Sequence, residues 1–371
     1  MTSRYNFSTG RFLYVLVVLL FSLTYLQAQK AEKNLSKTFP INADGTTSLE
    51  NKYGSMNIEV WDRNEVKIEV TVEAKANNDR KVRQILDGID VDFSNGSDYV
   101  SAETDFNLKG INNASYTVTY EVHMPATNEL KASMKYGNLK LGKLIGSADI
   151  EVKYGTFQIE SIGDNSTIEV AYSGADCTLA EAKDLMVEAS YSRVHIYNAR
   201  DIKMESKYCQ GMEIENARRV TLDSKYDRYT IGEVERLAVE TEYSNYTIDK
   251  VEEALMDAGY TNVKIGTLKD RFVGSLSYNT CVISKVMKGF DELVMDGSHA
   301  NFKLGIESGA SYRLEAQGKY ANVRYDDEGM DIQRDIQRSS SFELKGSKGG
   351  SSARSRVVAE LSYGSLKIEE L

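Results

Sequence analysis

Proline is almost missing from this chain. The 371 residues include 2 prolines, Pro40 and Pro125, against 23 tyrosines. Proline cannot donate a hydrogen bond to a β-ladder, whereas aromatic side chains favour pleated surfaces. The composition therefore favours strands that run without interruption.

Cysteine and histidine are also scarce, at 3 each. An odd and small number of cysteines argues against a disulfide framework. His123, His195 and His299 lie far apart in the chain, which argues against a zinc site of His and Cys ligands. No phosphate-binding loop, Gly-x-Ser-x-Gly elbow or Cys-x-x-Cys motif occurs. We therefore expect no cofactor and no catalytic residues.

Residues 1–28 are predicted to be a secretory signal peptide. Arg4 and Arg11 precede an apolar run over residues 12–26, which Gln27 and Ala28 follow. The alternative is a transmembrane anchor, but about 15 apolar residues fall short of the roughly 20 that span a bilayer. We expect cleavage after Ala28 and no transmembrane segment in the mature chain.

The charge of the chain is negative. The formal net charge is -10, and removal of residues 1–28 leaves 43 Lys and Arg against 55 acids, which gives -12. Nucleic acid and anionic membrane surfaces are themselves negative, so neither is expected as a partner.

A tyrosine-centred repeat fills the rest of the chain. From Tyr136 to Tyr278 successive tyrosines are 18, 18, 19, 17, 18, 17, 17 and 18 residues apart, and later steps are 21, 21 and 43. His299 replaces the tyrosine once. Such a short period is typical of stacked units that share one core. The repeat tyrosines are Tyr53, Tyr136, Tyr154, Tyr172, Tyr191, Tyr208, Tyr226, Tyr243, Tyr260, Tyr278, Tyr320 and Tyr363.

Within each unit the alternation of apolar residues changes phase at the tyrosine. Apolar residues occupy positions -6, -4 and -2 before it, as in Leu130, Ala132 and Met134, and positions +3 and +5 after it, as in Phe157 and Ile159. A period of two that shifts from even to odd positions indicates a strand that turns a corner. Each unit therefore supplies two short strands and two bends.

Two architectures could use this unit. A meander of hairpins would need Asn-Gly or Asp-Gly turns, which are scarce, whereas a β-solenoid would stack equivalent residues directly. A propeller is disfavoured, because its blades need roughly 40 residues or more, about twice the length of this repeat. We predict an all-β fold, a β-solenoid of 17–21-residue rungs.

The predicted organisation has four parts after the leader. Residues 29–129 form an N-terminal antiparallel β cap that holds the first repeat and one helix, with Asp79 as the N-cap and Val82, Ile85, Leu86 and Ile89 on its apolar face. Residues 130–325 form the solenoid, residues 326–356 a polar loop excursion, and residues 357–371 a final rung.

The sequence resembles a family of bacterial putative adhesins that are exported β-solenoid domains of unknown function. The resemblance rests on a unit of the form Leu-Glu-Asn-x-x-Gly-x-Met-x-Ile-x-Val-Trp-Asp at residues 49–62, a strand that ends at Pro125, the short Tyr-Gly-like rungs, and a glycine-rich loop before the last rung. It covers most of the mature chain. It implies a location in the periplasm or at the cell surface of a bacterium, and no catalytic residue is carried over from it.

The repeat tyrosines are expected to form an aromatic ladder that lies inward or lines a corner. Tyrosine shares its parity with the apolar -2 and -4 positions, and stacked rings stabilise one another. If the ladder is instead exposed, it becomes a binding surface. Tyr229 and Tyr246 fall at inward +3 positions and are assigned to the core, as are Cys177 and Cys281, while Cys209 is expected at a corner.

The position three before the tyrosine forms an acidic column on the outward face. The outward position two residues further along carries Lys153, Lys207 and Lys225, which can offset the negative charge. In the units from Glu240 to Asp296 the same position carries Glu242 or a small residue instead of lysine. The column is either a solvated face or a weak site for a divalent cation or a cationic partner, with Glu240, Glu242 and Asp257 as candidate ligands. Its members are Glu50, Glu151, Glu169, Glu188, Glu205, Asp223, Glu240, Asp257, Asp296 and Glu360.

These observations favour a non-enzymatic exported protein of the cell envelope that acts as an adhesin-like, scaffolding or sensing surface toward an envelope protein or an extracellular glycan. The alternative is a carbohydrate-binding or lyase-like β-helix protein. A lyase would need acids and bases grouped in a groove. The nearest such group, Asp326, Asp327, Glu328 and Asp331, is equally typical of a solvated loop.

Overall fold

The computed structural model describes residues 29–371 apart from residues 111 and 351. The predicted signal peptide lies outside these residues. In the part of the chain that the structure describes, no helix is long and apolar enough to cross a membrane.

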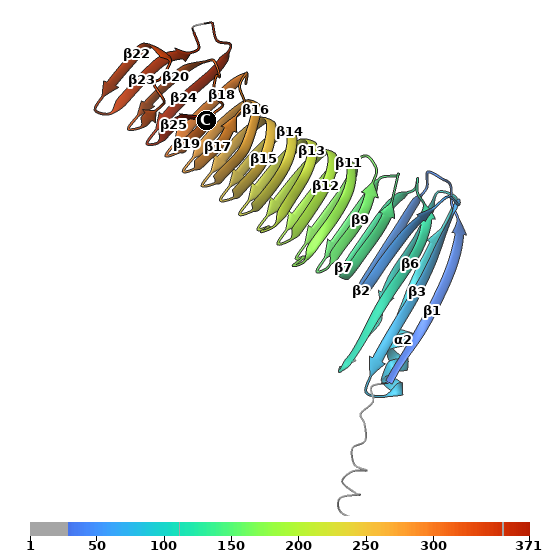
Figure 1. The fold of residues 1–371 in the computed structure, drawn as a ribbon. Coiled ribbons are helices and arrows are strands. Elements are labelled where there is room, and N and C mark those ends of the chain that lie inside the picture. The colour runs from blue at the N-terminus through green and yellow to red at the C-terminus, as the bar shows by residue number, and fades with distance from the viewer. Residues whose placement is uncertain (1–28, 111, 351) are drawn as a thin grey trace, which may run out of the picture.

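The fold is all-β with one helix among the described residues, as predicted. The rungs of the stack are seen edge-on in Figure 1. The strands and the helix are β1 (Gln29–Pro40), β2 (Thr46–Trp61), β3 (Glu65–Ala76), α2 (Asp79–Gly88), β4 (Ile89–Asn95), β5 (Tyr99–Phe106), β6 (Ala114–Pro125), β7 (Glu129–Lys143), β8 (Ala148–Lys153), β9 (Thr156–Ile162), β10 (Ser166–Ala171), β11 (Asp176–Ser190), β12 (Arg193–Lys207), β13 (Met212–Lys225), β14 (Arg228–Glu242), β15 (Asn245–Gly259), β16 (Asn262–Ser277), β17 (Thr280–Val286), β18 (Glu292–Ser298), β19 (Asn301–Ile306), β20 (Tyr312–Lys319), β21 (Asn322–Arg324), β22 (Met330–Arg338), β23 (Ser341–Lys348), β24 (Ser355–Ser362) and β25 (Ser365–Glu370).

Successive rungs pair in parallel, so that each residue lies beside its equivalent in the next unit. This is the solenoid arrangement that the repeat predicted, because hairpins would have paired neighbours in antiparallel. Apolar residues at the inward positions become continuous columns through the core. One such column, at position +5 in most units, runs through Ile196, Ile214, Ile231, Ile248, Ile265 and Ile283.

The N-terminal end is closed by antiparallel strands. β2 lies between β7 and the pair β5 and β6, and β3 runs antiparallel between β6 and β1. Helix α2 packs below β1 and β3 in Figure 1 and buries Val82 and Ile85. Its N-cap is Asn78, whose side chain accepts a hydrogen bond from the Lys81 N–H, so the prediction of Asp79 was wrong by one residue.

At the C-terminal end the last rung is inserted into the stack. β24 pairs with β18 on one side and β20 on the other, and β25 lies between β19 and β21. Figure 1 accordingly places the C-terminus beside β19 and β25 and not at the tip. The tip is formed by β22 and β23, an antiparallel hairpin that pairs with β20. The prediction of a polar loop over residues 326–356 was therefore wrong for most of that segment.

Candidate functional site

The repeat tyrosines form one continuous stack of rings along the solenoid. Adjacent ring centroids are 4.6–5.2 Å apart and the planes are within 12° of parallel. We call this column the tyrosine ladder. In spatial order it contains Tyr53, Tyr136, Tyr154, Tyr172, Tyr191, Tyr208, Tyr226, Tyr243, Tyr260, Tyr278, His299, Tyr363 and Tyr320.

Every member of the ladder has a left-handed backbone. The twelve tyrosines and His299 have φ between 49° and 62°. For a residue with a side chain this conformation costs roughly 1–2 kcal/mol, and glycine or asparagine adopts it more readily. The left-handed residue turns the strand through the corner, which is why the inward parity changes at the tyrosine.

The ladder lies outside the core. Its tyrosines are 37–63% exposed, and His299 is exposed as well. The prediction that the rings could point into the core was therefore wrong, whereas the prediction that they line a corner is correct. Because adjacent rings cover each other's faces, the ladder offers the ring edges and the phenol oxygens to the surroundings. The result is an aromatic strip that extends from the first rung to the last.

Where the residue after the tyrosine is polar, it is buried, and in several units its side chain accepts a hydrogen bond from the backbone of a neighbouring rung. The Ser244 N–H donates to the Thr261 Oγ1 at 3.2 Å, and the Thr261 N–H donates to the Asn279 Oδ1 at 2.6 Å. Similar bonds link Ser173 to Ser192 and Cys209 to Asp227. These side chains satisfy backbone groups that the corner would otherwise leave buried without a partner. The small polar residues after the tyrosines are therefore structural.

Asp227 is the one acid in this inner column. It is 1% exposed and accepts hydrogen bonds from the Ser206 hydroxyl and from the backbone N–H groups of Cys209 and Lys225. Burial raises the pKa of Asp227, and the three hydrogen bonds only partly offset it. Tyr229 and Tyr246 are buried beside it and stacked at 5.0 Å, as predicted for +3 positions.

Asp227→Ser is expected to change how stability depends on pH. An acid whose pKa is raised in the folded protein stabilises the folded state most at pH values below its pKa in the unfolded chain. This stabilisation is lost as the pH rises through the pKa of the acid in the folded protein. Wild type should therefore lose stability relative to Asp227→Ser as the pH rises above about 4, the ordinary pKa of an aspartate. Denaturant unfolding of both proteins across this range measures it. A constant difference would show that Asp227 has the same pKa in both states. Ser244 occupies the equivalent position, so serine fits there.

Tyr226→Ala is expected to lower the free energy of unfolding by about 1–3 kcal/mol. Its ring is 37% exposed and stacks on Tyr208 and Tyr243, and each aromatic pair contributes about 0.5–1.5 kcal/mol. A fully buried ring would instead cost roughly 3–5 kcal/mol. Tyr226→Asn should cost less than Tyr226→Ala, because asparagine tolerates the left-handed backbone. Denaturant unfolding compares the three proteins, and a larger loss for asparagine would contradict the role assigned to the corner.

The acidic column runs parallel to the ladder. Glu151 and Glu169 both contact the Lys153 Nζ, at 2.5 and 2.8 Å, so Lys153 offsets the column as predicted. Glu240 and Asp257 are neighbours in the register. Glu242 meets the Lys225 Nζ at 2.6 Å, which corrects the expectation that this acid is uncompensated. Among the described residues no group of three or more His, Cys, Asp or Glu side chains could hold a metal ion.

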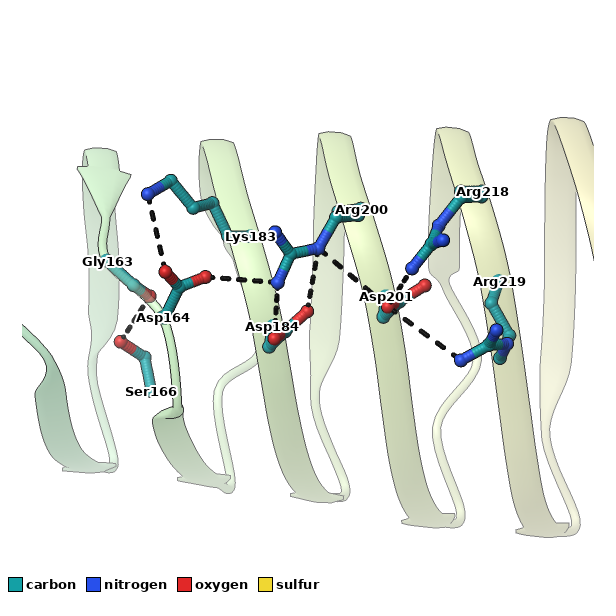
Figure 2. Close-up of polar contacts among 9 residues, drawn as sticks. All are labelled: Gly163, Asp164, Ser166, Lys183, Asp184, Arg200, Asp201, Arg218 and Arg219. Carbon is teal, nitrogen blue, oxygen red and sulfur yellow. Dashed lines mark hydrogen bonds and ion pairs between the residues drawn. The ribbon is translucent and has the colours of Figure 1, made fainter.

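A column of alternating charge lies on another turn of the rungs (Figure 2). Arg200 reaches Asp184 at 2.5 Å and Asp164 at 3.2 Å, and Arg218 reaches Asp201 at 2.5 Å. Figure 2 shows these side chains bridging from rung to rung along the axis. Exposed ion pairs contribute about 0–1 kcal/mol each. We assign this column to register between rungs, since its charges are matched internally.

The remaining candidate residues lie apart from one another. The acids at residues 326–328 and 331 are exposed at the C-terminal tip. Cys177 and Cys281 are buried as predicted, and Cys209, which was expected at a corner, is buried as well. Burial raises the pKa of Cys209 to about 11 and of Cys281 to about 12. His195 contacts Glu215 at 2.9 Å on an outward face, far from His299 in the ladder.

Comparison with known proteins finds similar solved structures at low sequence identity. No family model matches the chain, and no curated protein matches it. A putative adhesin from Parabacteroides merdae is 11% identical, with a TM-score of 0.29, over 91% of this chain and 96% of its own. A putative cell adhesion protein from Clostridium sporogenes is 10% identical, with a TM-score of 0.20, over 92% and 100%. A putative lipid binding protein from Parabacteroides distasonis is 11% identical, with a TM-score of 0.25, over 91% and 96%.

Proposed function

We propose that this chain is a non-enzymatic, exported protein of the bacterial cell envelope whose solenoid presents the tyrosine ladder as an adhesive or scaffolding surface. One observation carries the proposal. Thirteen corners hold an aromatic ring in a left-handed conformation, and all thirteen rings are exposed in one strip. The partner is an envelope protein or an extracellular glycan.

The choice of residue at the corner supports this function. Glycine or asparagine would turn the chain with less backbone strain. Stacking offsets part of the strain of tyrosine, but it would do the same for rings turned away from solvent. What the exposed position adds is a surface of aromatic edges and hydroxyl groups, and tyrosine is enriched where proteins bind partners.

The state of the titratable groups supports a non-enzymatic role. Cys209 and Asp227, which could act as a nucleophile and an acid, are buried in the inner column and bonded to backbone and core side chains. The raised pKa of the Cys209 thiol keeps it protonated at neutral pH. Both residues therefore serve the corner and not a reaction.

A carbohydrate ligand is favoured by a second column beside the ladder. Position +2 carries exposed amides and hydroxyls in register, among them Asn245, Asn262, Thr280 and Asn301. The Asn262 Nδ2 donates to the Asn245 Oδ1 at 3.1 Å. Aromatic groups next to a few placed polar groups are the usual lining of sites for small polar ligands. A glycan chain could contact both columns along several rungs.

Substitution of five ladder tyrosines by asparagine tests the proposal. Asparagine keeps the left-handed corner, so the variant should remain folded, which circular dichroism checks. The matched control replaces two exposed tyrosines outside the ladder, Tyr99 and Tyr197. Glycan arrays and proximity labelling in the native cell should show wild-type contacts that the control keeps and the ladder variant loses. The substituted residues are Tyr208, Tyr226, Tyr243, Tyr260 and Tyr278.

Two results would contradict the proposal. If the folded ladder variant keeps the full set of contacts, the ladder is not the contact surface. If wild type releases product in a hydrolase or lyase screen on polysaccharides, the chain is an enzyme and the carbohydrate-active alternative replaces the proposal.

A further inference from the structure

The sheet face that precedes the ladder changes character halfway along the solenoid. In the N-terminal half Lys153 contacts Glu151 and Glu169, and Lys203 contacts Glu205, while Glu188 has no such partner among the described residues. From Asp223 onward, five exposed carboxylates of the column have no ion pair or hydrogen bond with a side chain of the described chain. They are Asp223, Glu240, Asp257, Asp296 and Glu360.

An aliphatic column lies next to these carboxylates, two residues earlier in each strand. Ala238, Leu255, Val273, Val294 and Val358 are in register and point outward. Leu255 is 43% exposed and the others are partly exposed. In the N-terminal direction the column continues as Thr221 and Lys203, so its aliphatic members accompany four of the five acids, Glu240, Asp257, Asp296 and Glu360, and not Asp223.

Two grooves follow this face. One, of about 540 Å³, is lined by Ala238, Leu255 and Val273 together with Glu240 and Asp257. The other, of about 640 Å³, lies where the β22–β23 hairpin meets β20 and β24. Asp296, Glu360 and Phe342 line it, together with the basic Lys319 and Arg338. Carboxylates and apolar side chains thus share the same depressions.

We propose that this face docks a polypeptide segment in which basic and aliphatic side chains are interspersed. Charge complementarity favours that occupant. Neighbouring rungs are about 4.8 Å apart, and like charges at that distance destabilise a sheet. Lysine or arginine side chains of a partner would neutralise the column, while aliphatic side chains would cover Leu255 and Val273. This proposal does not depend on the function assigned to the tyrosine ladder.

Binding of a labelled synthetic Lys-Val-Lys-Ser repeat peptide to the full chain tests the proposal. The face variant carries Asp223→Asn, Glu240→Gln, Asp257→Asn, Asp296→Asn and Glu360→Gln. We expect it to bind the peptide at least tenfold more weakly, by fluorescence anisotropy at low salt. The matched control removes five exposed acids from other sides of the rungs and should bind like wild type. These acids are Glu160, Glu181, Glu235, Asp249 and Glu252.

A pair of peptides tests the apolar part of the face. Leu255→Ser with Val273→Ser should weaken binding of the Val-containing peptide but leave a Lys-Ser peptide unaffected. The five-tyrosine ladder variant should bind the peptide like wild type, which separates this proposal from the ladder. Removal of the acids relieves repulsion, so the face variant should melt no lower than wild type.

Four outcomes would overturn the proposal. If the face variant and the control lose the same amount of peptide affinity, the peptide responds to the net charge of the chain alone. Equal affinity for the Lys-Val-Lys-Ser and Lys-Ser peptides would remove the aliphatic column from the site. Absence of peptide binding to wild type would exclude the occupant. If the peptide does not bind and millimolar calcium raises the melting temperature of wild type but not of the face variant, the face is a cation site.

Discussion

Gly155→Ala is expected to lower the free energy of unfolding by more than about 3 kcal/mol. A Cβ atom at this position would lie 1.7 Å from the carbonyl oxygen of Gly137 in the preceding rung. Both groups are backbone held by the parallel ladder, so neither can move without opening the corner. Gly155 follows Tyr154, and Gly137 and Gly364 occupy the same position with similar clearances of 2.1 Å. Denaturant unfolding with a structural probe of the sheet measures the loss.

Gly142→Ala is the matched control for this prediction. A Cβ at Gly142 would meet only the Ile58 carbonyl oxygen at 3.8 Å, an ordinary contact. The substitution removes backbone freedom from the unfolded chain and should be neutral or stabilise by up to about 1 kcal/mol. If Gly155→Ala proves as mild as Gly142→Ala, adjacent corners are not held as closely as the structure shows.

Removal of residues 355–371 is expected to open the whole C-terminal end of the solenoid. These residues form β24 and β25, which separate β18 and β19 from β20 and β21. Without them the β20–β23 unit loses its parallel partners and β18 presents an unpaired edge, which favours association with other chains. We expect fast hydrogen exchange and protease cleavage from about residue 290 onward, together with concentration-dependent oligomers in light scattering.

Point substitutions separate this effect from a general loss of length. Leu366 in β25 is 0% exposed, whereas the adjacent Lys367 points outward. Leu366→Asp buries an unpaired charge, so it should reproduce the fast hydrogen exchange that the truncation causes at this end of the solenoid. Lys367→Asp leaves its charge exposed and should not. Protection of β20 that survives the truncation would show that the hairpin cap holds without the inserted rung.

The repeat made the solenoid predictable because each inward position has a fixed parity and spacing. The residues at +3 and +5, such as Phe157 and Ile159, are buried as their parity required. The tyrosines shared the parity of the -2 and -4 positions, so the pattern pointed them inward. A left-handed φ reverses the side to which the next residue points, and nothing in a hydrophobic pattern reports the sign of φ. Tyrosine is also an unusual residue for that conformation.

The two ends were harder to predict, because their pairing is distant in sequence. The 43-residue step from Tyr320 to Tyr363 was visible, but only the structure shows that Tyr363 stacks between His299 and Tyr320. The hairpin β22–β23 was predicted to be a loop because a polar run at residues 326–329 precedes it and a Gly- and Ser-rich tract covers residues 346–352. Strand β22 is also exposed and carries charges such as Arg334 and Asp335. Charged side chains on an edge strand hinder pairing with other chains and also mask the strand in the sequence.

The insertion of β2 and of β24–β25 inside the stack has a consequence for how this protein can change its length. Parallel units cannot be added beyond either cap without rebuilding it, since the outermost strands β1 and β22 run antiparallel to their neighbours. A duplication or deletion of one 17- or 18-residue unit between β9 and β16 leaves both caps intact. Each such event would change the length of the rod by about 4.8 Å. It would also add or remove one ring of the aromatic strip, so the length of the rod and the length of its exposed aromatic surface would change together in evolution.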